Sequence, residues 1–331
     1  MGQALLEVEG LAIRFATDGG TLAAVDGLDF ALEPGRTLAI VGESGCGKSA
    51  TALALMGLLA SNAKVSGSIR LAGRELLGLP AAAMQQIRGA EMAMIFQEPM
   101  TSLNPAFTVG DQISEAILRH RGVTRAEARA QAIAMLDRVR IPAPALRYDE
   151  YPHKLSGGMR QRAMIAMALA CNPKLLIADE PTTALDVTIQ AQILELLRTL
   201  GRETGTAIIL ITHDLGVVAE MADDVLVMYA GRAAERAPAS ALFEMPQHPY
   251  TVGLLGAMPS LAERRARLAA IDGMVPDLRK PIAGCRFAPR CPFVLPRCGT
   301  DAPELASVGP GHLAACLAAP LDRWIALRGA A

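Results

Sequence analysis

The chain has 331 residues, of which 51% are hydrophobic and 20% are charged, and its formal net charge is −1. This composition is typical of a globular chain with a sizeable core, and the charge balance excludes a charge-driven nucleic-acid partner. The first residues lack a basic segment followed by an apolar one, and no long apolar run is free of Pro, Gly or charge. We therefore expect neither a signal peptide nor a membrane span.

Short strands dominate the first part of the chain. The predicted strands cover residues 5–9 with 11–15, 27–33 and 67–73. The strand over 27–33 ends at Pro34-Gly35, a pair that predicts a hairpin at this point.

A glycine-rich loop follows. Residues 42–49 read GESGCGKS and fit the phosphate-binding pattern G-x-x-x-x-G-K-[ST], between an apolar strand over 37–41 and a helix-favouring run over 50–59. Glycines there let successive N–H groups face phosphate oxygens, and the helix N-terminus adds partial positive charge. We expect Lys48 to reach the β- and γ-phosphates and Ser49 to ligate Mg²⁺, whereas the thiol of Cys46 is incidental. The expected nucleotide-binding residues are Gly42, Ser44, Gly45, Cys46, Gly47, Lys48, Ser49 and Ala50.

Apolar strands and helices then alternate. A buried strand over 92–96 ends at Gln97, and an all-helical block over 98–152 follows, with helices near 109–121 and 125–139. Further strands are predicted over 175–178, 207–212 and 225–229, and further helices near 157–171 and 187–203. This alternation predicts an α/β fold with a mostly parallel sheet and a helical insertion.

Polar residues follow several of these strands. Gly42, Asp179 and His213 fall at or just after the carboxyl ends of strands, where open α/β sheets bind ligands. Asp179 would hold Mg²⁺, directly or through water, and Glu180 can polarise the water that attacks the γ-phosphate. Gly157 and Gly158 begin a helix, so their N–H groups are available to an anion.

Several motifs in register carry a family resemblance. Residues 155–161, LSGGMRQ, are similar to the signature sequence of ABC (ATP-binding cassette) ATPases. Gln97 matches the Q-loop glutamine, Ala184-Leu185-Asp186 the D-loop and His213 the switch histidine, all in the family's order. Up to about residue 240 the chain therefore resembles the nucleotide-binding subunit of an ABC transporter.

The resemblance implies a fold class and a domain plan. The fold would be an α/β P-loop NTPase cassette of the ABC type, with a mostly parallel core sheet, an antiparallel β subdomain and a helical insertion. The ATPase core would cover 1–97 and 153–240, and the helical subdomain would cover 98–152. A loop-rich, Pro-rich C-terminal extension would cover 241–331.

The resemblance also implies residue roles. Glu180 would act as general base, and His213 would contact the γ-phosphate. Gln97 would ligate Mg²⁺ together with Ser49 and Asp179. Phe15 would stack on adenine, although a Phe at a strand end is equally expected in the core. Asp186 would bridge to a second ATPase subunit, and the signature would cap the ATP held by that subunit; its residues are Ser156, Gly157, Gly158 and Gln161.

The implied partners form a membrane complex. They are a second ABC ATPase subunit (an identical chain or a paralogue), two transmembrane permease subunits and, indirectly, an extracytoplasmic solute-binding protein. No nucleic acid is expected. ATP binding would close the ATPase dimer and hydrolysis would reopen it. The chain would lie peripherally on the cytoplasmic face of the membrane.

Two stretches indicate the subfamily. Residues 94–105, MIFQEPMTSLNP, and 247–251, QHPYT, resemble the ATPase subunits of dipeptide and oligopeptide importers, whose relatives also carry nickel or other small solutes. The implied function is peptide import, with nickel or another solute as the alternative. A soluble ABC ATPase acting on ribosomes or DNA is less favoured, because the chain has one cassette and no long coiled coil. A metal-sensing regulator built on an ATPase core is the third hypothesis.

Four cysteines gather near the C-terminus: Cys285, Cys291, Cys298 and Cys316, spaced C-x5-C-x6-C-x17-C. This spacing matches neither common zinc sites nor common ferredoxins, but in a cytosolic chain it favours metal over disulfides. Arg286, Arg290 and Arg297 could offset thiolate charge. The family resemblance implies a [4Fe–4S] cluster in at least some members; zinc is the alternative, and four packed, metal-free cysteines are the third possibility.

Overall fold

The computed structural model describes residues 4–97, 102–183, 186–257 and 271–321. These residues divide into two compact units. Unit 1 takes its described residues from Met1–Leu5, Leu32–Arg36 and Gly78–Ile211, and unit 2 from Leu6–Ala31, Thr37–Leu77 and Thr212–Ala331. None of the helices in the described ranges is both long and apolar enough to cross a membrane.

Unit 1 contains three short parallel strands. They lie in the order β6 (Met92–Ile95), β7 (Leu175–Asp179) and β8 (Ala207–Ile211), and every residue in them is buried. Short apolar runs of this kind are typical of parallel strands covered on both faces. The unit also contains α2 (Ala81–Ile87) and α8 (Val187–Thr204). The three strands confirm the sequence prediction to within one residue.

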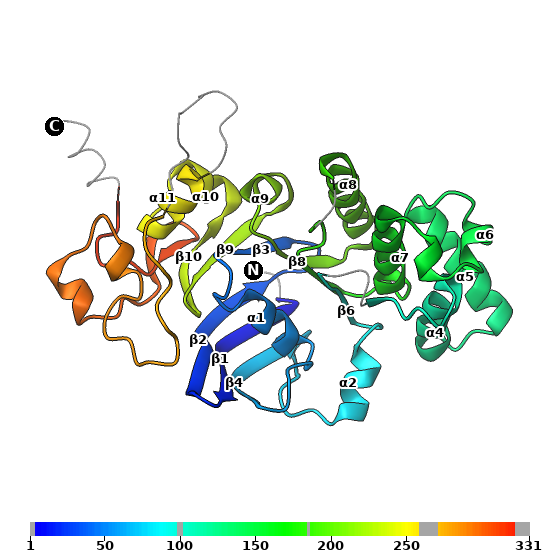
Figure 1. Cartoon of the computed structure of the whole chain (residues 1–331), viewed down its shortest axis with the longest axis horizontal. Coiled ribbons are helices and arrows are strands. Elements are labelled where there is room, and N and C mark those ends of the chain that lie inside the picture. The colour runs from blue at the N-terminus through cyan, green and yellow to red at the C-terminus, as the bar shows by residue number, and fades with distance from the viewer. Residues whose placement is uncertain (1–3, 98–101, 184–185, 258–270, 322–331) are drawn as a thin grey trace. The chain divides into compact units, whose positions relative to one another are not determined.

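A group of helices forms the rest of unit 1 (Figure 1). It comprises α4 (Val109–Arg121), α5 (Arg125–Arg138), α6 (Pro144–Tyr148), a 3₁₀ turn over Pro152–Lys154, and α7 (Gly157–Leu169). Local side chains fix where the first two begin: the Thr108 and Thr124 hydroxyls accept N–H groups of the first turn, and Thr124 forms a capping box with Glu127. Both helices confirm the predicted ranges, whereas α6 was not predicted.

Unit 2 begins with an antiparallel sheet in the order β2-β1-β4-β5. The strands are β1 (Leu6–Thr17), β2 (Gly20–Leu32), β4 (Ala63–Leu71) and β5 (Arg74–Glu75), drawn in blue and cyan in Figure 1. The hairpin predicted at Pro34-Gly35 is wrong, because β2 and the following β3 (Thr37–Val41) belong to different sheets. A Pro-Gly pair reverses the chain but does not specify which strand its neighbour pairs with.

A second group of strands in unit 2 has the order β11-β12-β10-β9-β3. Here β3 and β9 (Asp224–Tyr229) run parallel, and β9 pairs antiparallel with β10 (Arg232–Pro238). The last two strands, β11 (Ala306–Gly309) and β12 (His312–Ala314), come from the C-terminal extension, and β12 pairs with β10. The helical elements among the described residues of unit 2 are α1 (Lys48–Leu55), α9 (Leu215–Met221), α10 (Ala239–Glu244), α11 (Pro249–Gly256), and 3₁₀ turns η2 (Ala288–Arg290) and η3 (Pro296–Gly299).

Candidate active site

The phosphate loop joins β3 to α1 in unit 2, and two of its glycines are required by geometry. Gly42 has φ +148° and Gly47 has φ +106°. A Cβ at Gly42 would lie 2.2 Å from the Met228 carbonyl oxygen, and one at Gly47 would lie 2.5 Å from the Ala24 carbonyl oxygen. Only glycine avoids both the backbone strain and the clash, so both positions require the residue that the motif places there.

The lysine of the motif begins α1 and is nearly buried. Its Nζ donates to the carbonyl oxygens of Gly42 at 2.7 Å and Glu43 at 3.0 Å. The ammonium is therefore held against the loop that is expected to cradle phosphate. Ser49 and Ala50 follow Lys48 in the first turn of α1, and Ser44 and Gly45 lie exposed in the loop.

Cys46 belongs to the same loop and is buried. Burial raises the pKa of its thiol above the ordinary value, so the neutral form predominates near pH 7. Lys48 Nζ donates to its Sγ at 3.7 Å, and the interpretation of the thiol as incidental stays a prediction.

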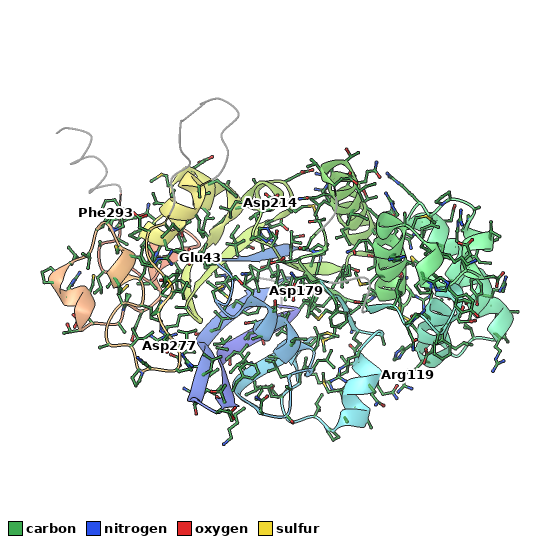
Figure 2. All side chains as sticks on the ribbon, in the orientation of Figure 1. Glu43, Arg119, Asp179, Asp214, Asp277 and Phe293 are labelled. Carbon is green, nitrogen blue, oxygen red and sulfur yellow. The ribbon has the colours of Figure 1, made fainter. Side chains whose placement is uncertain are left out.

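In unit 1 the two acidic residues stand at the end of β7. Asp179 is the last residue of the strand and is buried (Figure 2). Glu180 follows with φ +46°, an uncommon conformation for a residue other than glycine and one that often marks functional sites. Gln97 Nε2 donates to Glu180 Oε2 at 3.1 Å, and Thr183 Oγ1 donates to the same oxygen at 2.8 Å. The carboxylate is thus oriented by two side chains, one of them the predicted Q-loop glutamine.

The signature residues lie at the start of α7. Ser156 is the N-cap and accepts the N–H of Met159 at 3.3 Å, and Gly157 and Gly158 form the first turn. Gln161 is buried, and its amide donates to the Pro181 carbonyl next to Glu180. Its expected contact with nucleotide stays a prediction, and in this structure it holds the segment that follows the acidic pair.

The other predicted site residues have the following places. Asp186 is the N-cap of α8 and accepts the N–H of Ile189 at 3.0 Å. Phe15 is half-buried on β1, outside the fully buried core, and His213 is exposed between β8 and α9. Ala184 and Leu185 of the D-loop, and residues 98–101 of the peptide-importer motif, lie outside the described residues.

The cysteine-bearing segment supplies backbone donors to its sulfurs. N–H groups of Phe293, Leu295 and Ala318 point to the Sγ atoms of Cys291, Cys298 and Cys316, each at 3.4 Å. Burial raises the pKa of the Cys285 and Cys316 thiols, and raises that of Cys291 to about 11. Among the residues described, no three His, Cys, Asp or Glu side chains are arranged to hold a metal ion. The expected [4Fe–4S] or zinc centre is therefore not confirmed.

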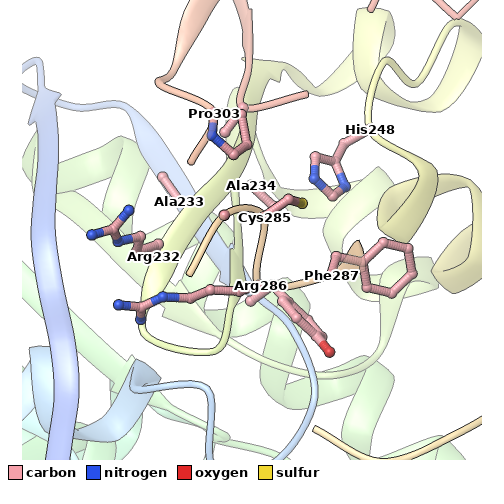
Figure 3. A pocket seen from close by; sticks show the side chains of 11 residues that line it. Arg232, Ala233, Ala234, His248, Cys285, Arg286, Phe287 and Pro303 are labelled. Atoms are coloured by element: carbon pink, nitrogen blue, oxygen red, sulfur yellow. The ribbon is translucent and has the colours of Figure 1, made fainter. Parts of the chain in front are cut away.

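Arg286 and Arg297 of this segment, and Arg232 on β10, bind oxygen atoms. Figure 3 shows a pocket of unit 2 in which Arg232 and Arg286 extend to one side, away from His248. Both guanidinium groups bind Asp26 Oδ2, at 2.7 Å from Arg232 and 2.5 Å from Arg286. Arg297 donates to the Leu317 carbonyl at 2.6 Å. In this structure the guanidinium groups thus contact a carboxylate and a carbonyl oxygen, and the predicted offset of thiolate charge is not the contact that they make.

A buried carboxylate joins the extension to β10. Glu235 has no exposed surface, and its Oε1 accepts the N–H of Gln247 at 2.6 Å and lies 2.6 Å from His312 Nε2. Its Oε2 accepts the N–H of His248 at 3.0 Å. A buried charge is stable only when its acceptor sites are filled, and here all three donors come from the extension.

The sequence reasoning missed Glu43, which stands at a variable position of the phosphate-loop motif. Its carboxylate binds Arg290, and its N–H is held by Tyr250, both from the extension. The sequence indicates Arg290 only as a counter-charge and Tyr250 only as part of a family motif. No local pattern gives such contacts, because the partners are more than 200 positions apart.

Comparison with known proteins decides the family. Residues 25–183 match the family described as ABC transporter, and residues 234–298 match the C-terminal region of oligopeptide/dipeptide transporters. The chain is 54% identical over 312 residues to the oligopeptide transport ATP-binding protein OppD of Salmonella typhimurium, covering 94% of this chain and 93% of that one. The chain belongs to the oligopeptide-transport ABC ATP-binding proteins. The Escherichia coli OppD is 53% identical over 313 residues, covering 95% of this chain and 93% of its own length.

Solved structures support the same fold for this ABC ATPase subunit. The ATP-binding cassette MJ0796, in a dimeric post-hydrolysis state with ADP and Pi, superposes with a TM-score of 0.64 at 25% identity, covering 71% of this chain and 98% of that one. The cbiO1 subunit of Clostridium perfringens gives a TM-score of 0.62 at 28% identity, covering 73% and 92%. The predicted α/β ABC cassette fold is confirmed, and the chain is an ATPase subunit of this type.

Proposed function

We propose that this ATPase subunit powers the import of oligopeptides across the cytoplasmic membrane. Its relatives in Salmonella and Escherichia coli are named for oligopeptide transport, and its extension matches a region described by the same cargo. The observation that carries the catalytic role is Glu180, which stands after β7 with its carboxylate oriented by Gln97 and Thr183. A carboxylate fixed in this way can accept a proton from water as the water attacks the γ-phosphate.

The remaining motif residues have complementary roles in the proposal. Lys48 would exchange its loop carbonyl contacts for phosphate oxygens, and the loop N–H groups would bind the same phosphates. Ser49, Gln97 and Asp179 offer hydroxyl, amide and carboxylate oxygens, which are the ligands that Mg²⁺ prefers. The Mg²⁺ ion would neutralise charge on the β- and γ-phosphates. His213 and Phe15 are assigned to the γ-phosphate and the adenine.

The proposed assembly is a dimer of ATPase subunits on two permease subunits, fed by an extracytoplasmic binding protein. A related cassette is described as a dimer. Gly157 and Gly158 open α7 and would cap ATP bound by the opposite subunit, and Asp186 would face that subunit. Attachment to the membrane would come through the permeases.

We also propose that the four cysteines bind a metal centre, with [4Fe–4S] preferred over zinc. Four thiols in one segment, three of them with a backbone N–H directed at the sulfur, provide a donor set of the right chemistry. Because burial raises the pKa of the Cys285, Cys291 and Cys316 thiols, metal binding must displace their protons. Iron, sulfide and zinc content of the chain purified without oxygen tests this: no metal in the wild type, or equal metal in a variant with all four cysteines changed to Ser, would contradict it.

Peptide uptake tests the cargo. Cells that lack this gene should lose uptake of labelled oligopeptides and regain it with the wild-type chain but not with Glu180→Gln. Uptake of labelled Ni²⁺ in the same strains is the comparison. Loss of nickel uptake with normal peptide uptake would overturn the peptide assignment while leaving the ATPase role intact.

A further inference from the structure

The C-terminal extension reaches the phosphate loop through Arg290. The Nη1 and Nη2 atoms of Arg290 donate to Oε2 and Oε1 of Glu43 at 2.7 Å and 2.9 Å, so the pair is bidentate. The Arg290 side chain is 4% exposed and that of Glu43 is 27% exposed. Charge-assisted bidentate pairs of this kind are among the strongest side-chain hydrogen bonds, and partial burial limits their screening by solvent. Glu43 lies in the loop immediately after Gly42 (Figure 2).

The guanidinium is fixed by further contacts in the extension and on β9. Arg290 Nε donates to the Asp272 carbonyl at 2.9 Å, and Nη2 donates to the Ile271 carbonyl at 3.1 Å. Nη1 also donates to the Tyr229 hydroxyl at 3.3 Å. The hydrogen bonds to Glu43 raise the pKa of Arg290 above its usual value, so the side chain stays charged at every ordinary pH. Arg290 therefore holds one position and links the extension to the loop through its hydrogen bonds.

A second part of the extension holds the backbone of the same residue. The N–H of Glu43 donates to the Tyr250 hydroxyl at 2.7 Å. Tyr250 lies in α11 and is completely buried, with its ring 4.7 Å from that of Tyr229 and 5.5 Å from that of Phe287. Because the ring is packed on these aromatic neighbours, its hydroxyl has a fixed position. The side chain and the backbone of Glu43 are thus held independently, by two segments of the extension.

Glu43 in turn contacts the motif lysine, because its carbonyl oxygen accepts a hydrogen bond from Lys48 Nζ. We propose that Arg290 and Tyr250 are positioning residues of the phosphate loop: the extension fixes Glu43, and through it the loop conformation that binds nucleotide phosphate. A loop that is already ordered loses less entropy when phosphate binds, so the extension raises nucleotide affinity. The proposal rests on nucleotide binding by this loop.

The extension offers a matched control. Arg286 lies four positions before Arg290, is also mostly buried, and also ties the extension to the rest of unit 2. Its partners are Asp26 on β2 and the Ala230 carbonyl oxygen after β9. Arg290→Gln and Arg286→Gln each remove one charge and one buried ion pair from the same segment. Only the first removes a contact to the phosphate loop.

The test is binding of a fluorescent N-methylanthraniloyl derivative of ATP to the full-length chain, with urea unfolding measured on each variant. We expect Arg290→Gln to raise Kd about tenfold and Arg286→Gln to change it less than about twofold, at similar loss of stability. Arg290→Lys, which keeps the charge but loses the bidentate geometry, should recover part of the affinity. Tyr250→Phe, which keeps the packed ring, should raise Kd about threefold.

A double-variant cycle separates positioning from general damage. In a Glu43→Gln background, Arg290→Gln should have little further effect on Kd, because the pair is already broken. Equal effects of Arg290→Gln and Arg286→Gln, or an unchanged Kd in a folded Arg290→Gln chain, would overturn the proposal. A wild-type chain that fails to bind the ATP derivative would instead overturn nucleotide binding by the loop.

Discussion

Two sets of residues support the expected nucleotide chemistry of this molecule in different ways. The motif residues (Gly42, Gly47, Lys48 and Glu180) owe their places to local sequence: glycine conformations, a strand end and a helix start. The extension residues (Glu235's partners Gln247, His248 and His312, together with Tyr250 and Arg290) owe theirs to contacts across long stretches of chain. A change at Glu180 in the first set should therefore alter chemistry with little loss of stability, whereas Gly42 and Gly47 cannot be changed without strain and clash. Changes in the second set should alter stability, with Arg290 and Tyr250 linking the two.

The largest expected effect lies among the motif residues. Glu180→Gln keeps the shape of the side chain but removes the base, so kcat for ATP hydrolysis should fall about 1,000-fold while nucleotide affinity and stability stay close to wild type. Phosphate release in the assembled complex measures the rate. Glu203→Gln, at an exposed position of α8, is the control and should be near wild type. More than a tenth of wild-type turnover in Glu180→Gln would contradict the assignment.

The next effect concerns pH and the extension. Burial lowers the pKa of His248 to about 4, against about 6.5 in an unfolded chain. Between these values the unfolded state binds a proton that the folded state excludes, so stability falls as pH is lowered through this window. At about 1.4 kcal/mol per pKa unit, the loss from this residue approaches about 3 kcal/mol near pH 4.

Urea unfolding of wild type and His248→Asn across this pH range isolates that contribution. Asparagine can still accept the Tyr250 N–H that His248 Nδ1 accepts at 3.1 Å, so the start of α11 keeps its cap. The stability of the variant should depend less steeply on pH than that of wild type. Parallel pH profiles would contradict a neutral, buried His248.

A smaller effect is expected at Glu235. In Glu235→Gln an NH₂ group replaces one carboxylate oxygen and faces a donor whose hydrogen bond that oxygen now accepts. This change should lower the free energy of unfolding by about 2 kcal/mol. Glu244→Gln, at an exposed position of α10, should change it by less than about 0.5 kcal/mol. Urea denaturation of both variants gives the free energy of unfolding. Equal free energies for the two variants would show that Glu235 does not stabilise the extension.

The same contrast explains what could be predicted from the sequence. The strand–loop–helix around Lys48, the strand that ends at Asp179 and the helices with Thr caps follow from short-range pattern, and each was predicted closely. The pairing of β10 with β12 and the Glu43–Arg290 pair could not be predicted, because they join residues 77 or more positions apart and leave no periodic trace. The hairpin at Pro34-Gly35 was wrong for the same reason: a turn signal is local, whereas strand partnership is not.

The buried Glu235 also bears on how such chains can be rearranged in evolution or in the laboratory. A cassette cut after β10 would keep every nucleotide motif, yet it would expose a carboxylate whose three donors had been removed with the extension. In the cut chain, water would have to reach the Glu235 carboxylate on β10 in place of the lost donors. The cut chain would also lose the contacts of Arg290 and Tyr250 with Glu43. The extension is therefore not an exchangeable module, and recombination that gains or loses it must also change the residue at position 235.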